Sequence, residues 1–200
     1  MKMSEICTIY GRIGFRGYTQ QDMVIKGQGA ISLSPGNIQN NSLTFNDCKY
    51  ISWEKYEESP EIKIYNGDVI FVKTGSTVGK VGFVKDLTEK ATLNPQLVVF
   101  KNLKVNGKYL YYVLGKSDIQ DKVKALAGVG SVPNISQNNI SKIEIPVPPI
   151  DVQERIVNVL DNFDAICSDL KIGLPAEIEA RRKQYEYYRD RLLSFSRGGN

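Results

Sequence analysis

The sequence predicts an α+β fold in which a β-rich, mixed globular domain precedes a long C-terminal helical coiled-coil segment. Up to residue 145, short apolar runs alternate with Gly, Asn and Pro, which is typical of strands joined by turns. The run Ile145-Pro-Val-Pro-Pro-Ile150 ends this pattern, because proline lacks an N–H and cannot continue a helix or a central strand. Beyond it, apolar residues recur at helical spacing. We therefore divide the chain into a domain over 1–149 and a helical region over 150–200.

Strands and two helices can be placed within the first domain from the residue pattern. Alternating apolar residues over 61–72 predict a strand, and Pro95 precedes a second, buried strand over 97–100. A weak helical pattern covers 52–58, and a stronger one covers 108–127. The first domain is therefore expected to mix strands and helices.

The helical region is expected to begin at Asp151, which together with Glu154 forms an Asp variant of the capping box. Its apolar residues then follow a heptad spacing that slips at Gly173-Leu-Pro175. The slip fits either one bent helix or a helix that ends and restarts, and the low helix propensity of Gly and Pro favours the break. The seam residues expected at a dimer or partner interface are Ile156, Leu160, Phe163, Leu170, Ile178, Tyr185, Tyr188 and Leu192.

A helical seam of this length needs another surface to bury it. One arrangement is a helix hairpin folded back onto its own domain, and the other is a coiled coil with a second copy of the chain. The pattern favours the second copy, because a nearly continuous helix over 151–195 would span roughly 67 Å at 1.5 Å per residue, more than the expected diameter of the first domain. Two identical chains related by a two-fold axis would form a contact that closes on itself. We therefore expect a homodimer through the C-terminal helices.

Composition restricts the classes of function. A chain of 200 residues, 42% of them hydrophobic, supports one well-cored domain with an appended element. The three cysteines are far apart and histidine is absent, which disfavours metalloenzymes and most hydrolases, so we expect no metal and no cofactor. No apolar stretch approaches the roughly 18 residues of a membrane span, and no signal sequence is recognised. A soluble, cytoplasmic protein is expected.

Charge is distributed unevenly along the chain. Residues 1–145 hold 18 Lys and Arg against 13 Asp and Glu, whereas the remaining residues hold 8 against 9. A polyanionic partner is therefore expected to contact the N-terminal part.

A glycine-flanked loop, Gly75-Ser-Thr-Val-Gly-Lys80, partly matches the phosphate-binding loop of nucleotide hydrolases. The spacing between its glycines is one residue short, and Val81 stands where a Mg²⁺-binding Ser or Thr is required, so nucleotide hydrolysis is disfavoured. The loop still offers donors suited to phosphates and base edges, although an ordinary polar turn explains this feature equally well. The residues that offer these donors are Lys73, Thr74, Ser76, Thr77 and Lys80.

Two further segments carry side chains suited to nucleic acid. Arg12, Arg16 and Tyr18 lie in a glycine-rich stretch, and arginine pairs with guanine edges and phosphates. The stretch 128–139 is rich in amides, which pair with adenine but are also common in loops. The candidates in that stretch are Ser131, Asn134, Gln137 and Asn138.

Several longer motifs together carry a family resemblance. They are Asn66-Gly-Asp-Val-Ile-Phe-Val-Lys-Thr-Gly-Ser-Thr-Val-Gly-Lys80, Leu93-Asn-Pro-Gln-Leu97, Gln153-Glu-Arg-Ile156 and the runs 135–150 and 173–193. In these segments the chain resembles the specificity subunit of type I restriction-modification enzymes. Asn94-Pro-Gln-Leu97 also differs at two positions from the signature of amino-methyltransferases, but no glycine-rich cofactor loop accompanies it. A methyltransferase is therefore disfavoured.

The resemblance implies a subunit without catalytic residues. In that family, a target recognition domain reads one half of a bipartite site in double-stranded DNA. Conserved helices set the spacer and bind methyltransferase (modification) subunits, which in turn recruit the nuclease-translocase. Members usually carry two recognition domains, so we expect a second copy, or a different chain, to complete the site. The alternative function is a coiled-coil adaptor with no specific DNA target.

Overall fold

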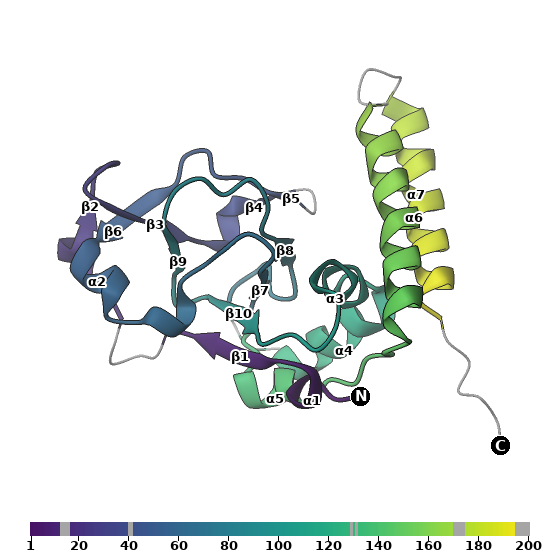
Figure 1. Cartoon of the computed structure of the whole chain (residues 1–200), viewed down its shortest axis with the longest axis horizontal. Helices are drawn as coiled ribbons and strands as arrows, with labels where there is room; N and C mark the ends of the chain where they lie inside the picture. The colour runs from purple at the N-terminus through teal and green to yellow at the C-terminus, as the bar shows by residue number, and fades with distance from the viewer. Residues whose placement is uncertain (13–16, 40–41, 129, 131, 170–174, 195–200) are drawn as a thin grey trace.

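The computed structural model describes residues 1–12, 17–39, 42–128, 130, 132–169 and 175–194. The chain forms a globular part that mixes strands and helices, with two long helices at one end of it (Figure 1). The predicted mixture of α and β structure is confirmed. Among the described helices, none combines the length and apolar character needed to cross a bilayer.

The centre of the globular part is a four-stranded antiparallel sheet in the order β1-β10-β7-β8. Its side chains alternate between two apolar cores, so that Phe71 and Phe100 enter one core while Ile70 and Val99 enter the other. Burial on both faces explains why β7 and β10 read as continuous apolar runs. The four strands are β1 (Thr8–Gly11), β7 (Val69–Val72), β8 (Val81–Phe83) and β10 (Leu97–Lys101).

A second four-stranded sheet, in the order β2-β6-β3-β9, closes the second of these cores. Strand β3 pairs antiparallel with β6 and parallel with β9. Gly29 permits the close approach of β3 to β6, since a Cβ there would lie 1.9 Å from the carbonyl oxygen of Ile51. The strands of this sheet and of a separate hairpin are β2 (Met23–Val24), β3 (Gly29–Leu33), β6 (Lys49–Ser52), β9 (Ala91–Leu93), β4 (Ile38–Gln39) and β5 (Ser42–Leu43).

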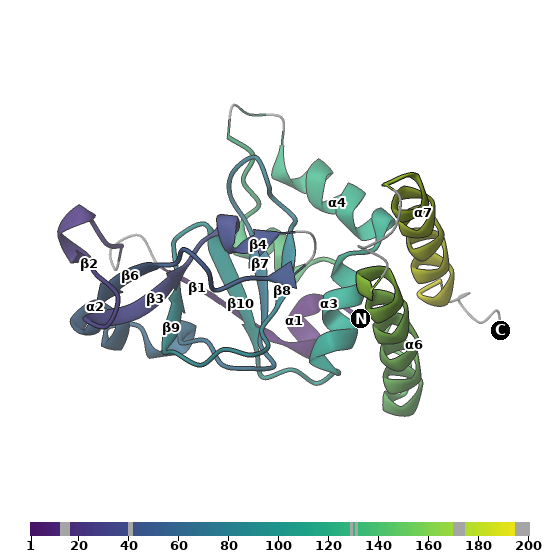
Figure 2. The same ribbon diagram turned by 90° about the horizontal axis from the view of Figure 1, so that it is seen from above.

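Short helices cover the other face of the central sheet (Figure 2). The helix predicted over 108–127 is two helices, because the backbone at Lys116 is extended, with φ −65° and ψ 140°. The weak helix predicted over 52–58 is confirmed as α2 (Trp53–Glu57), and Ser52 caps it by accepting from the N–H of Lys55. The helices on the central sheet are α1 (Met3–Ile6), α3 (Gly107–Leu114), α4 (Ser117–Ala127) and α5 (Gln137–Ser141).

One of the two predicted strands is longer in the prediction than in the structure. The strand expected over 97–100 is β10, but the strand expected over 61–72 begins only at Val69. Ahead of Val69 the chain forms a 3₁₀ helix, Pro60–Ile62, and a turn in which Asp68 accepts from the N–H of Tyr65 at 2.8 Å. Turn formation by Asp and Gly therefore outweighs the alternation of apolar residues here.

The helical region begins with α6 (Ile150–Asp169). The carbonyl oxygen of Pro149 accepts from Val152 and Gln153, so Asp151 lies in the first turn of the helix and the predicted cap at Asp151 is wrong. Gln153 is 2% exposed and accepts from the N–H of Asn106, the residue that caps α3, at 2.9 Å. This bond ties the start of α6 to the start of α3.

The second long helix, α7 (Pro175–Leu192), packs beside α6 in an antiparallel hairpin (Figure 1). The rings of Phe163 and Tyr188 stack with centroids 5.8 Å apart. In one continuous helix, these two residues would be separated by about 37 Å. The chain therefore reverses between α6 and α7, which excludes one bent helix. Residues 170–174 lie outside the described residues.

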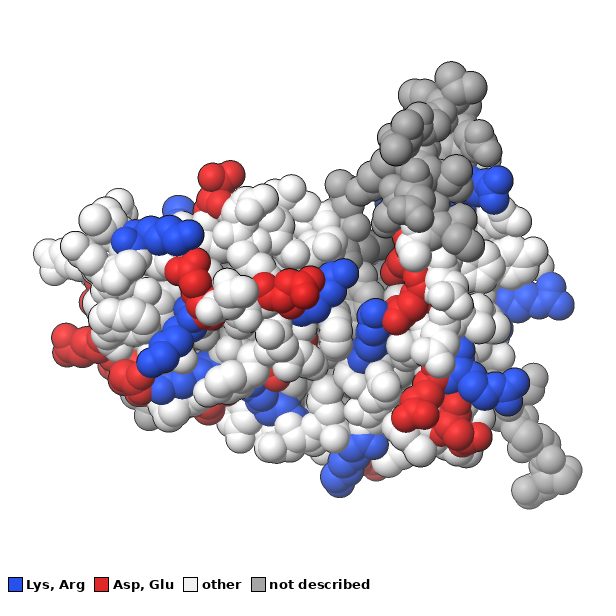
Figure 3. Space-filling view, turned by 45° about the horizontal axis from the view of Figure 1, so that its top comes forward, with Lys and Arg blue, Asp and Glu red and all other residues white. Residues whose placement is uncertain are grey.

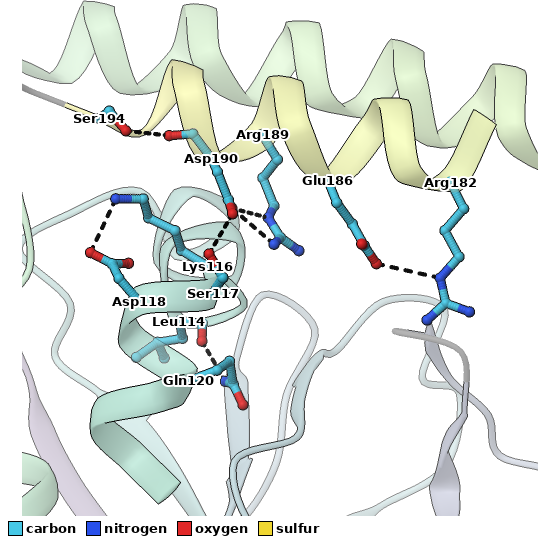
Figure 4. A network of polar contacts seen from close by, with 10 residues as sticks. All are labelled: Leu114, Lys116, Ser117, Asp118, Gln120, Arg182, Glu186, Arg189, Asp190 and Ser194. Atoms are coloured by element: carbon cyan, nitrogen blue, oxygen red, sulfur yellow. Dashed lines mark hydrogen bonds and ion pairs between the residues drawn. The ribbon is translucent and has the colours of Figure 1, made fainter. Parts of the chain in front are cut away.

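The end of α7 is fixed to the globular part by polar and apolar contacts. Asp190 accepts from Ser117, at the start of α4, and from Arg189 at 2.9 Å (Figure 4). Leu193, just after the helix, is fully buried in the core that contains Phe71 and Phe100. The hairpin folded back on its own domain, the arrangement that the sequence pattern disfavoured, is the one adopted.

Candidate nucleic-acid interface

An open cleft of about 1460 Å³ lies between the loop 73–80 and the segments around β2, β3 and the β4–β5 hairpin. Its lining contains hydroxyl, amide and ammonium groups from segments that are far apart in the sequence. Such groups are those that read base edges and hold phosphates. Five of the residues predicted from the sequence line this cleft: Tyr18, Thr74, Ser76, Thr77 and Lys80.

The loop 73–80 is a structured turn between β7 and β8. Gly75 and Gly79 have φ values of +109° and +94°, which side-chain-bearing residues rarely adopt. The amide of Gln120, on α4, donates to the carbonyl oxygen of Gly79 at 2.9 Å and holds the loop from outside. Lys73 lies at the base of the loop, where its N–H donates to Gln96, and does not line the cleft. The loop is therefore both the polar hairpin turn and one wall of the cleft.

The amide-rich stretch is only partly connected with the cleft. Asn134 lies beside the loop, since its Oδ1 accepts from the hydroxyl of Thr74 at 2.6 Å. Gln137 and Asn138 belong to α5 and do not line the cleft. Ser131 lies outside the described residues. The structure thus brings Asn134, but not the α5 amides, to the predicted surface.

The structure corrects the prediction that Arg12 contacts DNA, because the side chain of Arg12 is buried. It is 4% exposed, and its Nε donates to the carbonyl oxygen of Leu93 at 3.1 Å. A terminal guanidinium nitrogen donates to Thr92 at 3.3 Å, and the group lies 5.4 Å from the ring centroid of Tyr18. These contacts hold the buried guanidinium beside Tyr18, one of the residues that line the cleft. Arg16 lies outside the described residues.

The residue pattern did not identify another part of the cleft lining, which comes from β3 and from the residues that join β9 to β10. Ser32 hydrogen-bonds to the hydroxyl of Tyr18 at 2.9 Å. Asn94 and Gln96, which the sequence indicated only as the start of a strand, also line the cleft. Their role could have been suspected from the amides directly before a buried strand, because such side chains sit at a sheet end on a rigid base.

Among the described residues that line the cleft, few carry a positive charge. Lys26, Lys49 and Lys80 line it together with Asp47, and Lys26 pairs with Glu89 at 3.3 Å. On the face shown in Figure 3, Lys and Arg side chains are intermingled with Asp and Glu side chains over the globular part. Uncharged amides and hydroxyls therefore dominate what this cleft offers a ligand.

Most of the described seam residues are covered from within the chain. Ile156 and Leu160 are 7% and 0% exposed and lie in the core that contains Phe71 and Phe100. Tyr185 and Leu192 are partly buried against the same core. This burial corrects the expectation that all of the seam residues lie at an interface with a second copy or a partner.

The remaining described seam residues contact each other across the hairpin. Phe163 and Tyr188 stack on each other, and Tyr188 remains 37% exposed. Leu170 and the side chain of Ile178 lie outside the described residues. Among the described seam residues, the surface left for a partner is therefore smaller than the sequence pattern indicated.

Comparison with known families assigns the chain. The sequence profile described as "Type I restriction modification DNA specificity domain" matches residues 1–180. The chain belongs to this specificity domain family. The sequence-based resemblance is confirmed, and the cleft and the hairpin are parts of a type I specificity domain.

Curated relatives of this specificity domain include subunits from two bacteria. The chain is 38% identical over 149 residues to the EcoR124I/EcoR124II specificity subunit of Escherichia coli, covering 73% of this chain and 36% of that protein. It is 34% identical over 131 residues to the MpnII specificity subunit of Mycoplasma pneumoniae, covering 66% and 38%. The chain thus spans little more than a third of the length of these relatives.

Solved structures share the fold of this specificity domain. The HsdS subunit from Thermoanaerobacter tengcongensis has a TM-score of 0.64 at 17% identity, covering 96% of this chain and 44% of that one. A chain from a study of assembly and conformational transition of the type I restriction-modification system has a TM-score of 0.68 at 17% identity, covering 96% and 45%. At this identity the likeness concerns the fold, including the helical hairpin.

Proposed function

We propose that this chain is the sequence-specific DNA-recognition part of a type I restriction-modification complex, and that its cleft reads one half of a bipartite target. The observation that carries the proposal is the cleft itself, in which polar groups from five separate segments face one space within a DNA specificity domain. Amide and hydroxyl groups read base edges, and Lys80 on the loop suits a phosphate.

The chain acts in this proposal without chemistry of its own. Methyltransferase subunits dock on the helical hairpin and modify the DNA that the cleft has selected, in the cytoplasm. The nuclease-translocase joins through those subunits. Support for a docking role comes from an aromatic side chain exposed on the hairpin, since Tyr187 is 59% exposed.

A selection experiment tests the recognition function. The full chain is incubated with a duplex DNA library randomised over its central positions, and bound sequences are read at several salt concentrations. Enrichment of a short motif, with affinity that falls as salt rises, is expected. Binding without sequence preference contradicts the proposal.

A pair of matched substitutions places the contact in the cleft. Ser76 is exposed on the cleft loop, and Ser4 is exposed on α1, away from the cleft. We expect Ser76→Glu to weaken DNA binding through repulsion of phosphates, and Ser4→Glu to leave it unchanged. Equal affinities of the two variants would show that DNA lies elsewhere.

We further propose that two copies associate through the hairpin and so read a symmetric, interrupted site. Val159, Phe163 and Tyr188 supply an aromatic and apolar surface there. Light scattering with the methyltransferase subunit present should give two copies of this chain per complex. Val159→Asp should reduce this number to one, whereas a single copy in the unchanged complex contradicts the dimer.

A further inference from the structure

Gln96 projects into the cleft from a rigid base. Its N–H donates to Oδ1 of Asn94 at 3.0 Å, and its carbonyl oxygen accepts from the N–H of Lys73 at 2.9 Å. Pro95 fixes one backbone angle before it, and Leu97 after it is fully buried in β10. The backbone of Gln96 is therefore held on both sides, while its side chain is exposed.

The amide group of Gln96 is also oriented. Asn94 is 8% exposed, and its Nδ2 donates to Oε1 of Gln96 at 3.1 Å. On the other side is Gly75, where even a Cβ would lie 3.3 Å from Nε2 of Gln96. Among the described residues, no acceptor is found for this Nε2 group. The amide thus keeps a donor and the second lone pair of its oxygen for a ligand.

We propose that Gln96 reads an adenine in the major groove and that Asn94 is the residue that positions it. An amide that offers one acceptor and one donor side by side matches N6 and N7 of adenine. Because Asn94 fixes the amide in advance, less side-chain freedom is lost when DNA binds. This assignment rests on the DNA-recognition function proposed above, and it names the base that one position of the cleft selects.

The library selection tests this assignment with substitutions at Gln96. The full chain should enrich motifs with an adenine at one position, and Gln96→Ala should lose that preference alone. Discrimination at that position should fall by about 5- to 150-fold, the usual range for one bidentate pair. Gln96→Glu, which replaces the donor by an acceptor, should select against adenine there. Gln28→Ala, an exposed glutamine that does not line the cleft, is the matched control and should leave the motif unchanged.

A substitution at Asn94 tests the positioning role. Asn94→Ser keeps an oxygen acceptor for the N–H of Gln96 but removes the Nδ2 donor that holds its side chain. We expect weaker discrimination at the same base position, with the rest of the motif and the melting temperature retained. A motif identical to that of the unchanged chain contradicts the positioning role.

The possible results separate this inference from the proposed function. A motif that persists in Gln96→Ala overturns the inference and leaves DNA recognition standing. A uniform loss of affinity for all sequences in that variant also overturns it, because Gln96 would then act on phosphates or on folding. An unchanged chain without any sequence preference overturns both.

Discussion

The hydroxyl oxygen of Tyr112, on α3, lies 2.9 Å from a carboxylate oxygen of Asp164, on α6. The same hydroxyl contacts Asp161, which also accepts from Lys108 at 2.6 Å. Since Tyr112 has one hydroxyl hydrogen, it can donate to only one of these two carboxylates at a time. Burial raises the pKa of Asp164 above its ordinary value, and the hydrogen bond from Tyr112 offsets only part of this effect. The junction between domain and hairpin thus binds a proton more tightly than an exposed carboxyl does.

The raised pKa of Asp164 predicts a stability effect with a definite sign. The folded chain holds this proton more tightly than the unfolded chain, so the free energy of unfolding falls as pH rises from about 4, the unfolded pKa, through the folded pKa. Asp164→Asn removes this titration and keeps groups that bond to Tyr112. We expect the stability of Asp164→Asn relative to the unchanged chain to increase as pH is raised from acid to neutral, as measured by urea unfolding.

Asp161→Asn is the matched comparison for this prediction. It weakens the contact with Lys108 and with Tyr112, so the free energy of unfolding should fall by about 1 to 3 kcal/mol. If Asp164→Asn and Asp161→Asn show the same loss at neutral pH, the two carboxyl groups do not differ in the way described.

Asp190 predicts the opposite dependence on pH. Although burial alone raises its pKa, hydrogen bonds from Ser117 and Arg189 outweigh this effect and hold the pKa below its ordinary value. A lowered folded pKa stabilises the chain above the unfolded pKa, and that contribution is lost as pH falls through the folded pKa. Asp190→Asn should therefore lower the free energy of unfolding at pH 7 and weaken its decline in acid.

A neighbouring acid provides the control for Asp190. Asp118 forms an ion pair with Lys116 at 3.2 Å, and its side chain is 52% exposed. Such exposed pairs contribute little, so Asp118→Asn should change the free energy of unfolding by less than about 1 kcal/mol. A larger effect at Asp118 than at Asp190 would show that the end of α7 is not fixed through Ser117.

Arg12 is expected to stabilise the fold without contacting DNA. Arg12→Ala leaves the buried acceptors on Leu93 and Thr92 without this donor, which should lower the free energy of unfolding by about 1 to 3 kcal/mol. Denaturant unfolding measures this loss, and the recognised motif should stay the same at a temperature where the variant is folded. A changed base preference at full stability contradicts the buried position.

Much of the fold could be predicted from the sequence where a residue pattern reflects local physics. The strand over 97–100 and the helix over 52–58 follow from apolar runs and a capping serine. Gly173 and Pro175 indicated that the helix is interrupted between α6 and α7. The residue pattern did not indicate which surface covers the two helices. Heptad spacing reports that a face is apolar, and it is silent on whether the covering surface belongs to the same chain.

The candidate site was predictable only in part for the same physical reason. Glycines flanking hydroxyls marked the loop 73–80, because backbone freedom and donors are visible in the sequence. Arg12 was misassigned, since the burial of an arginine depends on partners 80 residues away. Asn94 and Gln96 were missed because their place in the cleft lining depends on how segments that are distant in the sequence pack together, which the residue pattern does not show.

Lys80 provides a test that separates phosphate contacts from base reading. Its side chain is exposed on the rim of the cleft, and its ammonium group has only a long contact, 3.5 Å, with the carbonyl oxygen of Ile38. Lys80→Ala should weaken binding equally for all sequences and reduce the slope of log affinity against log salt by about 1, because one fewer counterion is released.

The comparison of Lys80→Ala with two other variants makes the result specific. Lys104 is exposed outside the cleft, so Lys104→Ala should keep both the affinity and the salt slope of the unchanged chain. Gln96→Ala should keep the salt slope while losing preference at one base. Fluorescence anisotropy over a salt series, with one selected and one scrambled duplex, gives both quantities. If Lys80→Ala alters base preference and leaves the slope unchanged, then Lys80 reads a base, and its assignment to a phosphate contact is wrong.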